Sequence, residues 1–191
     1  SENIFYISNI DENFGDDMLK KSDMTPNSNG LKLLGIKPYN GNTGSAKAVV
    51  VMNDDLSRLP GASNIETIIE LASYKSESSN TKVVMPVSTY AEINGTFVNF
   101  QNRVQRIRPA VASLEKERLP GEFSMSRLDK FGAHNDRWTH GARFNSRPAW
   151  KVIKQIAKAF GTDFAFENSE EVFMELSNTI EGMNGYDYDS V

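Results

Sequence analysis

The chain has 191 residues, a mass of 21.3 kDa and a net charge of −4. Hydrophobic residues make up 39% and charged residues 24%, which is typical of a globular protein and excludes a disordered or fibrous one. The chain has no cysteine, which excludes disulfides, a thiol nucleophile and thiolate-ligated zinc or iron–sulfur clusters within these residues. Residues 103–158 are basic and the remainder is acidic, and with a pI of 5.3 this favours a protein partner over nucleic acid.

The first third of the chain predicts a strand, a short helix and a long loop. Residues 3–10 alternate between apolar and polar side chains, which indicates a strand. Residues 12–21 place acids before lysines, as the helix dipole favours, and predict a short helix. Residues 25–46 are rich in Pro, Gly, Asn and Ser and predict a loop around one helical turn at residues 30–35.

Three apolar segments predict the core of a mostly parallel sheet. Residues 47–53 form a continuous apolar run, which suits a strand buried on both faces. Residues 65–73 favour a second strand, with a helix as the alternative, and residues 82–86 form a third strand that ends at Pro86. The segment between the first two strands is too short for more than a vestigial helix.

The middle of the chain is less regular. Residues 95–109 alternate with period two and predict a hairpin or an irregular arm. Residues 112–148 show no apolar period and predict a long basic loop with a functional or docking role. This loop contains His134 and His140, whose spacing differs from that of helical metal motifs, so a backbone-bonded histidine is favoured over a metal ligand and the role of both stays open.

Two helices are predicted to close the chain, at residues 147–161 and 168–182. The first ends at Gly161, the second begins with Ser169 as its N-cap, and residues 183–191 are expected to be frayed or cut from something longer. Their expected inner faces are Trp150, Ile153, Ile156, Ala157 and Phe160 for the first helix, and Val172, Phe173, Leu176 and Ile180 for the second. The predicted fold is therefore α/β: one domain over residues 1–191, with helices flanking a mostly parallel sheet in three layers and long irregular loops.

Polar residues follow the third predicted strand. Ser88 and Thr89 stand just beyond its end, where α/β proteins place ligands. No Gly-x-Ser-x-Gly turn or nearby His accompanies them, so hydrolase chemistry is weakly supported. Glu92 is interpreted as a structural ion-pair partner of Arg103 or Arg106 rather than as a general acid.

Residues "VVMPVSTYAEINGTFVNFQNRVQRIRPAV" and "RPAWKVIKQIAKAFG" together resemble the later α/β portion of molybdopterin-dependent oxidoreductases and of the large iron–sulfur subunit of respiratory complex I. "PNSNGLKLLGI" and "KAVVVMNDDL" are similar to two upstream segments of that family, so the resemblance covers most of residues 25–162. The places of the family pattern are held here by Met85, Pro86, Ala91, Glu92, Gly95, Thr96, Asn99, Arg103, Val104, Gln105, Trp150 and Gly161.

The departures from the family pattern favour its complex I branch. Gln101 and Asn102 replace a Glu-Gly pair, and "NDDLSRLP" replaces a Gly-Glu-Asn/Asp-Pro turn near the pterin nucleotide. The resemblance then implies a scaffold part of a larger electron-transfer subunit of NADH:quinone oxidoreductase, with no catalysis, cofactor or metal in this chain and iron–sulfur clusters elsewhere in the full subunit. It implies other subunits of a respiratory complex as partners and a cytoplasmic location peripheral to the inner membrane, without direct membrane insertion.

The resemblance also assigns roles to residues. A structural motif of Pro86, Glu92, Gly95, Thr96 and Gln105 is expected to form a lid over the carboxyl edge of the sheet. In it Gly95 supplies the turn, Thr96 and Asn99 hydrogen-bond that turn, and an acid such as Glu92 fixes Arg103.

The sequence does not decide which subunit residues 112–148 contact, or the oligomeric state. Two alternatives to the scaffold function also stay open. The first alternative is a part of an active molybdenum or tungsten enzyme such as formate dehydrogenase, in which Ser88, Thr89, Asn99 and Arg103 bind molybdopterin. The second is a stand-alone protein-interaction module.

Overall fold

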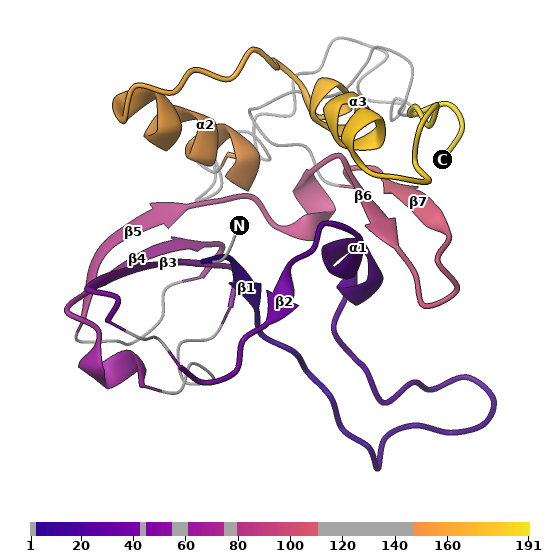
Figure 1. The fold of residues 1–191 in the computed structure, drawn as a ribbon, viewed down its shortest axis with the longest axis horizontal. Helices are drawn as coiled ribbons and strands as arrows, with labels where there is room; N and C mark the ends of the chain where they lie inside the picture. The colour runs from indigo at the N-terminus through magenta and orange to yellow at the C-terminus, as the bar shows by residue number, and fades with distance from the viewer. Residues whose placement is uncertain (1–2, 43–44, 55–60, 75–79, 111–146) are drawn as a thin grey trace, which may run out of the picture.

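The computed structural model describes residues 3–42, 45–54, 61–74, 80–110 and 147–191 (Figure 1). The predictions for residues 112–146, including His134 and His140, concern a part of the chain outside these ranges. The helices and strands are β1 (Phe5–Tyr6), α1 (Ser28–Leu33), β2 (Lys37–Pro38), β3 (Ala48–Met52), β4 (Thr67–Ala72), β5 (Thr81–Pro86), β6 (Gly95–Val98), β7 (Val104–Ile107), α2 (Ala149–Ala159) and α3 (Ser169–Thr179), with 3₁₀ turns at Ala62–Asn64 and Tyr90–Glu92.

The core is a parallel sheet in the order β3-β4-β5, as the three apolar segments predict. The central strand β4 is buried on both faces, since Ile68 and Leu71, which point to opposite sides, are 0% and 1% exposed. This burial decides the strand–helix ambiguity of residues 65–73 in favour of a strand. The only regular turn described between β3 and β4 is the 3₁₀ turn at Ala62–Asn64, which agrees with the expected vestigial helix.

Layers lie on both sides of the sheet, which gives the three-layer α/β arrangement predicted (Figure 1). On one side, Val51, Ile65 and Ile68 form a cluster against Ile7 and Tyr39, which adjoin the small parallel pair β1–β2. The strand predicted over residues 3–10 is thus reduced to the two residues of β1. On the other side α2 packs on the sheet through a second cluster of Leu71, Val87 and Val152.

The inner face of α2 differs from the prediction. Val152 is buried and Ile156 packs beside it, whereas Ile153 is 43% exposed and Phe160 is 86% exposed. The helix covers only part of the sheet, so a narrow stripe is buried in place of the wider face that the spacing of apolar residues predicts. The end of the helix is as expected, because Gly161 adopts a left-handed conformation with φ 89°.

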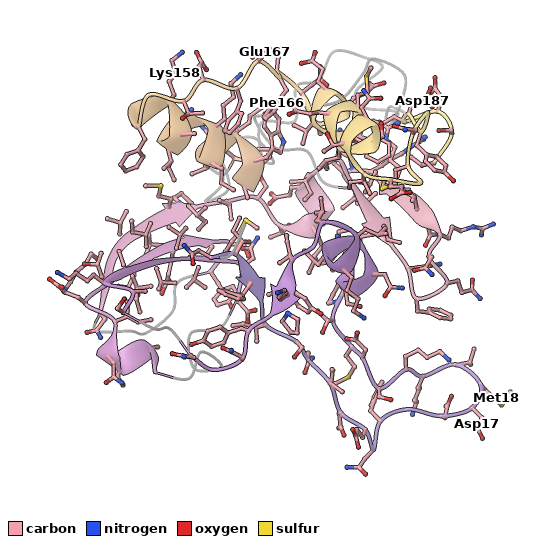
Figure 2. All side chains as sticks on the ribbon, viewed as in Figure 1. Asp17, Met18, Lys158, Phe166, Glu167 and Asp187 are labelled. Carbon is pink, nitrogen blue, oxygen red and sulfur yellow. The ribbon has the colours of Figure 1, made fainter. Side chains whose placement is uncertain are left out.

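Residues 12–21 form no helix, so that prediction is wrong. They form an arm that projects from the body of the molecule, with Met18 at its tip (Figure 2). The Asp16 carboxylate accepts hydrogen bonds from the backbone N–H groups of Met18, Leu19 and Lys20 at 2.9, 2.7 and 2.9 Å. These bonds lower the pKa of Asp16 and satisfy the backbone locally, which competes with helix formation.

The C-terminal helix matches its prediction apart from its cap. Phe173 is 2% exposed and faces inward, as expected. The N-cap is Asn168 rather than Ser169, because the Asn168 side chain accepts the Glu171 N–H at 2.9 Å. Within the part of the chain that the structure describes, no helix has both the length and the apolar composition needed to cross a bilayer.

The tail at residues 183–191 is folded, so the prediction that it is frayed is wrong. Met183 and Tyr188 are 7% and 4% exposed and form a cluster with Phe173. The Tyr188 ring lies 5.5 Å from the Phe173 ring and 4.2 Å from the Arg106 guanidinium. A single buried aromatic ring therefore joins the tail to both α3 and β7.

Tyr188→Ala is expected to lower the free energy of unfolding by about 2–4 kcal/mol, because it removes a buried aromatic side chain. The matched control Tyr186→Ala, at a side chain that is 40% exposed, is expected to cost less than about 1 kcal/mol. Urea unfolding followed by circular dichroism measures both. Equal losses for the two variants would show that the tail does not pack as described.

Candidate functional site

The candidate site lies where the carboxyl edge of the parallel sheet continues into the 3₁₀ turn and the β6–β7 hairpin (Figure 1). After β5 ends, Val87 makes a parallel bridge to Arg147 and the Ser88 N–H donates to the Arg147 carbonyl at 2.8 Å. The Ser88 side chain is 2% exposed, and its Oγ is buried without a hydrogen-bond partner. Ser88 is therefore held at the strand end as predicted, with a hydroxyl that the protein leaves unused.

Glu92 is held by Thr89, not by an arginine. Glu92 Oε2 accepts the Thr89 N–H at 2.9 Å and the Thr89 hydroxyl at 3.2 Å. The Glu92 side chain is 5% exposed, and its Oε1 has no hydrogen-bond partner. The expected ion pair with Arg103 or Arg106 is thus wrong, since the first turn after the strand offers its own donors to the carboxylate.

Gly95 does not supply a turn, contrary to the expectation. It lies in β6 opposite Ile107, without the left-handed conformation of a turn glycine, and Thr96 beside it pairs with Arg106 in the ladder. The turn lies at residues 99–103. There Asn99 Oδ1 accepts the N–H groups of Gln101 and Arg103, each at 2.9 Å, so Asn99 hydrogen-bonds this turn and not the one expected at Gly95.

Segment α1 holds the hairpin through two asparagines. Asn27 Oδ1 accepts the Val98 N–H at 2.7 Å, across 71 residues of sequence. Asn29 Nδ2 donates to the Asn99 carbonyl and to Asn102 Oδ1, both at 3.0 Å. Sequence reasoning missed these contacts, although the Asn and Gly of "PNSNGLKLLGI" were among the residues that carry the family resemblance.

Gly30 makes room for the Asn27 side chain. A Cβ at Gly30 would overlap Asn27 Oδ1, the atom that accepts the Val98 N–H. Glycine is therefore required here by a close approach, whereas a Cβ at Gly95 would meet Ile107 at an ordinary 3.5 Å.

The arginine that the structure fixes is Arg106 rather than Arg103. Its guanidinium stacks on Tyr188 and donates to Asn94 Oδ1 at 3.4 Å, and Asn94 is 5% exposed. Arg103 and Arg108 are exposed and, with Arg106, line a shallow groove of about 440 Å³ beside the C-terminal tail. This region is basic, but no acidic side chain among the described residues pairs with Arg103 in the way expected.

The structure separates the four predicted cofactor-binding residues into two groups. Ser88 and Thr89 lie before β6, and Asn99 and Arg103 lie after it, at the far end of the hairpin. The 3₁₀ turn Tyr90–Glu92 and the strand β6 lie between the two groups along the chain. Pro86 and Gln105, which belong to the expected structural motif, are exposed on β5 and β7.

Asn53 occupies the first place of the turn that replaces the family's glycine-containing turn. It adopts a left-handed conformation with φ 48°. Its Oδ1 accepts the Ser73 N–H at 3.1 Å and its own N–H donates to the Leu71 carbonyl at 2.8 Å, so it joins the ends of β3 and β4. Apart from glycine, asparagine is among the residues that adopt this left-handed conformation most readily. Asn53 can therefore start the turn with the backbone conformation that a glycine would adopt.

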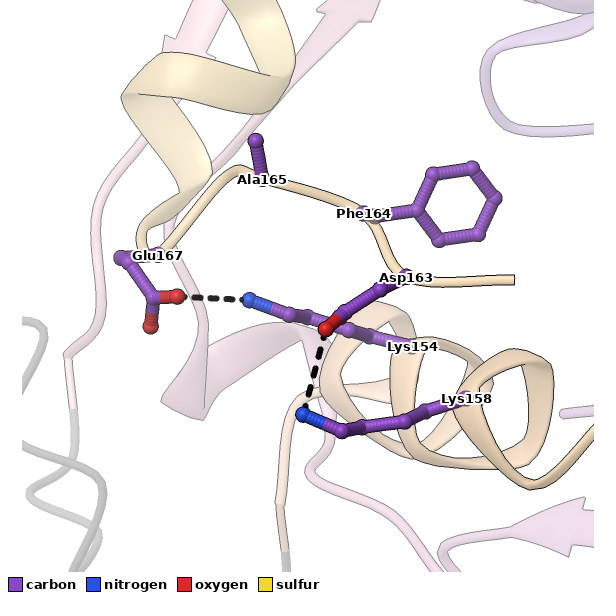
Figure 3. Close-up of a pocket in the computed structure, with 6 residues that line it drawn as sticks. All are labelled: Lys154, Lys158, Asp163, Phe164, Ala165 and Glu167. Atoms are coloured by element: carbon purple, nitrogen blue, oxygen red, sulfur yellow. Dashed lines mark hydrogen bonds and ion pairs between the residues drawn. The ribbon is translucent and has the colours of Figure 1, made fainter. Parts of the chain in front are cut away.

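A second cavity, of about 350 Å³, lies between α2 and the segment that leads to α3 (Figure 3). Its two lysines are already paired: Lys154 Nζ lies 2.8 Å from Glu167 Oε1, and Lys158 Nζ lies 3.2 Å from Asp163 Oδ2. The hydrogen bond from Lys154 lowers the pKa of Glu167. These pairs hold the segment against α2, and the cavity offers no unpaired lysine to a ligand.

Among the described residues, no group of three or more His, Asp or Glu side chains is placed to hold a metal ion. The predicted cofactor-binding residues carry two hydroxyls, at Ser88 and Thr89, one amide, at Asn99, and one guanidinium, at Arg103.

No family model matches the chain. The chain is 29% and 28% identical over 109 residues to the alpha subunits of F420-dependent formate dehydrogenases 1 and 2 of Methanococcus maripaludis. It is 24% identical over 107 residues to a Staphylococcus haemolyticus protein named provisionally as a formate dehydrogenase. Each match covers 56% of this chain but only 12% of the two Methanococcus proteins and 8% of the third. The chain is thus weakly similar to a small part of much longer formate dehydrogenases.

Gly30→Ala is expected to lower the free energy of unfolding by about 1–3 kcal/mol, because the new Cβ displaces Asn27 and breaks its bond to the Val98 N–H. The matched control Gly95→Ala is expected to change it by less than about 0.5 kcal/mol, since its Cβ meets ordinary contacts. Chemical denaturation measures both. A larger loss for Gly95→Ala would instead make that glycine the required one.

Proposed function

We propose that this chain is the part of a molybdenum or tungsten oxidoreductase, of the formate dehydrogenase type, that contacts the pterin nucleotide. The observation that carries the proposal is the similarity to formate dehydrogenase alpha subunits over 109 residues. The ordered series of motifs described above, over most of residues 25–162, supports the same family. Formate oxidation is proposed for the longer polypeptide and not for this chain alone.

The donor set at the site fits such a cofactor. Ser88 Oγ is buried without a partner, and Arg103 carries an exposed positive charge. The bonds within the hairpin turn engage Asn99 Oδ1 and leave its amide nitrogen able to donate. Hydroxyl, amide and guanidinium donors suit the heterocycle and phosphates of a pterin nucleotide. A ligand that contacts both groups has to extend along β6, because this strand separates them in the chain.

These residues would bind and orient the cofactor, with Ser88 and Thr89 at one end and Asn99 and Arg103 at the other. When bound, the pterin holds a molybdenum or tungsten ion that accepts the two electrons of the substrate. The left-handed Asn53 supports the proposal, because the turn after β3 begins as a glycine turn would. Glu92 holds Thr89 in position through the short bonds to its backbone and hydroxyl.

A specific observation favours a second function, the scaffold part of a complex I electron-transfer subunit. Neither of the two cavities described above is lined by Ser88, Thr89 or Asn99. The Thr89 hydroxyl also already donates to Glu92. In this reading the hairpin is purely structural, the iron–sulfur clusters lie elsewhere in the longer subunit, and the partners are other subunits of a respiratory complex.

Metal and pterin analysis of the full-length native subunit distinguishes the two functions. Elemental mass spectrometry and the fluorescence of oxidised pterin are expected to give molybdenum or tungsten and pterin in stoichiometric amounts. Iron without molybdenum, tungsten or pterin would contradict the proposal and leave the scaffold function.

Arg103→Ala is expected to lower the pterin content of the full-length subunit without lowering its melting temperature, because the Arg103 side chain is exposed. The matched control is Arg108→Ala, at an exposed arginine of the same groove that is not among the proposed contacts. If Arg103→Ala retains the pterin content of the control, the assignment of Arg103 is wrong.

A further inference from the structure

One face of the parallel sheet is only partly covered. In the register of the sheet, Met52 lies beside Leu71, and both Val50 and Val83 lie beside Ile69. Residues in register on parallel strands point to the same face, and Leu71 packs beneath α2. Val50, Met52 and Val83 therefore share the face on which α2 lies.

These three residues, called the open sheet face below, are not covered by α2. Val50 is 56% exposed, Met52 is 52% exposed and Val83 is 42% exposed. Parallel sheets in α/β proteins are covered by helices on both faces, and their strands are apolar throughout for that reason. The apolar run of β3 matches a covered strand, but within the described residues its outer face is not covered.

The outer edge of β3 shows the same feature. Edge strands are usually protected by charged residues, proline or a bulge. The other outer strand of the sheet, β5, carries Lys82 and Pro86 and has a register shift against β4. The sequence of β3, Ala-Val-Val-Val-Met, contains none of these features. Its composition is that of an inner strand of a wider sheet.

We propose that the open sheet face receives an amphipathic helix, preceded by a strand that pairs with β3, from a part of the same polypeptide outside these 191 residues. This rests on the proposed function in one respect, that the chain is a piece of a longer subunit. The length of the relatives supports it, because the matched stretch is only 12% of the Methanococcus proteins. A strand and its crossover helix are the unit by which a parallel sheet grows.

A second copy of the chain fits the open sheet face less well. Two copies related by a two-fold axis would pair β3 with β3 in antiparallel fashion. Because α2 lies over β4 and β5, such a dimer would leave Val50 and Met52 of both copies without a helix above them. A helix from the longer polypeptide covers the face and the added strand occupies the edge.

Thiol labelling of the full-length native subunit tests the proposal. Met52→Cys is compared with Met18→Cys, since Met18 is 84% exposed at the tip of the arm, and peptide mass spectrometry reads each site. The Met52→Cys thiol is expected to react with a maleimide about tenfold or more slowly than the Met18→Cys thiol. The reason is that the covering helix must move away before the reagent can reach position 52. Similar rates at the two sites would overturn the proposal, as would a gene that encodes only these 191 residues.

A photo-crosslinker in place of Val50 identifies what covers the face. The crosslinked peptide is expected to be an apolar, helix-forming segment of the same polypeptide outside this chain. Mixing ¹⁵N-labelled and unlabelled subunits detects a crosslink to a second copy, which would overturn the proposal, as would no crosslink. A subunit that lacks pterin, but whose Met52→Cys thiol reacts slowly, contradicts the proposed function and leaves this inference standing. A subunit that holds pterin, but whose Met52→Cys thiol reacts as fast as the Met18→Cys thiol, contradicts this inference alone.

Discussion

The hydrogen bond from the Val98 N–H to Asn27 Oδ1 joins segments that are 71 residues apart, and the position of the hairpin depends on it. It requires Gly30, because any side chain there would occupy the place of the Asn27 amide. The tail holds the hairpin independently, through the stacking of Tyr188 on Arg106. The hairpin is thus tied to both an early and a late part of the chain. The turn that holds Asn99 and Arg103 is placed by these contacts, at the end of β6 that is opposite to the 3₁₀ turn after Ser88 and Thr89.

The parts of the fold that are predictable from sequence are those that local patterns decide. The apolar runs of β3, β4 and β5, the alternation of β6 and β7, and the periodicity of α3 all match the structure. The tail was not predictable, because its order comes from the packing of Tyr188 against Phe173 and Arg106. The helix predicted over residues 12–21 is absent for a related reason. The Asp16 carboxylate accepts hydrogen bonds from three backbone N–H groups and so competes with the helix for them.

The positions of the candidate site residues relative to the strands were predictable, and their contacts were not. Ser88 could be placed at a strand end because ligand positions in α/β proteins follow strand order. The pairing of Glu92 with Thr89 has a sequence signature, the Thr-x-x-Glu spacing of a capping box, which the interpretation as an ion pair overlooked. Which arginine is fixed depends on the strand register, because Arg106 points toward Tyr188 and Arg103 lies in the turn. An alternation pattern alone does not set that register.

Under the proposed function, the incomplete cover of the sheet and the separation of the candidate site residues have one explanation in common. A cofactor that touches both ends of the hairpin is large, and a large cofactor site is usually built between several parts of a protein. This chain would then provide one wall of the site, which agrees with the lack of a cavity lined by Ser88, Thr89 or Asn99 among those described. The helix proposed above, from the same longer polypeptide, would cover Val50 and Met52. A sheet edge without protection and ligand atoms without an enclosing cavity are both expected of a segment that folds against the rest of a longer subunit.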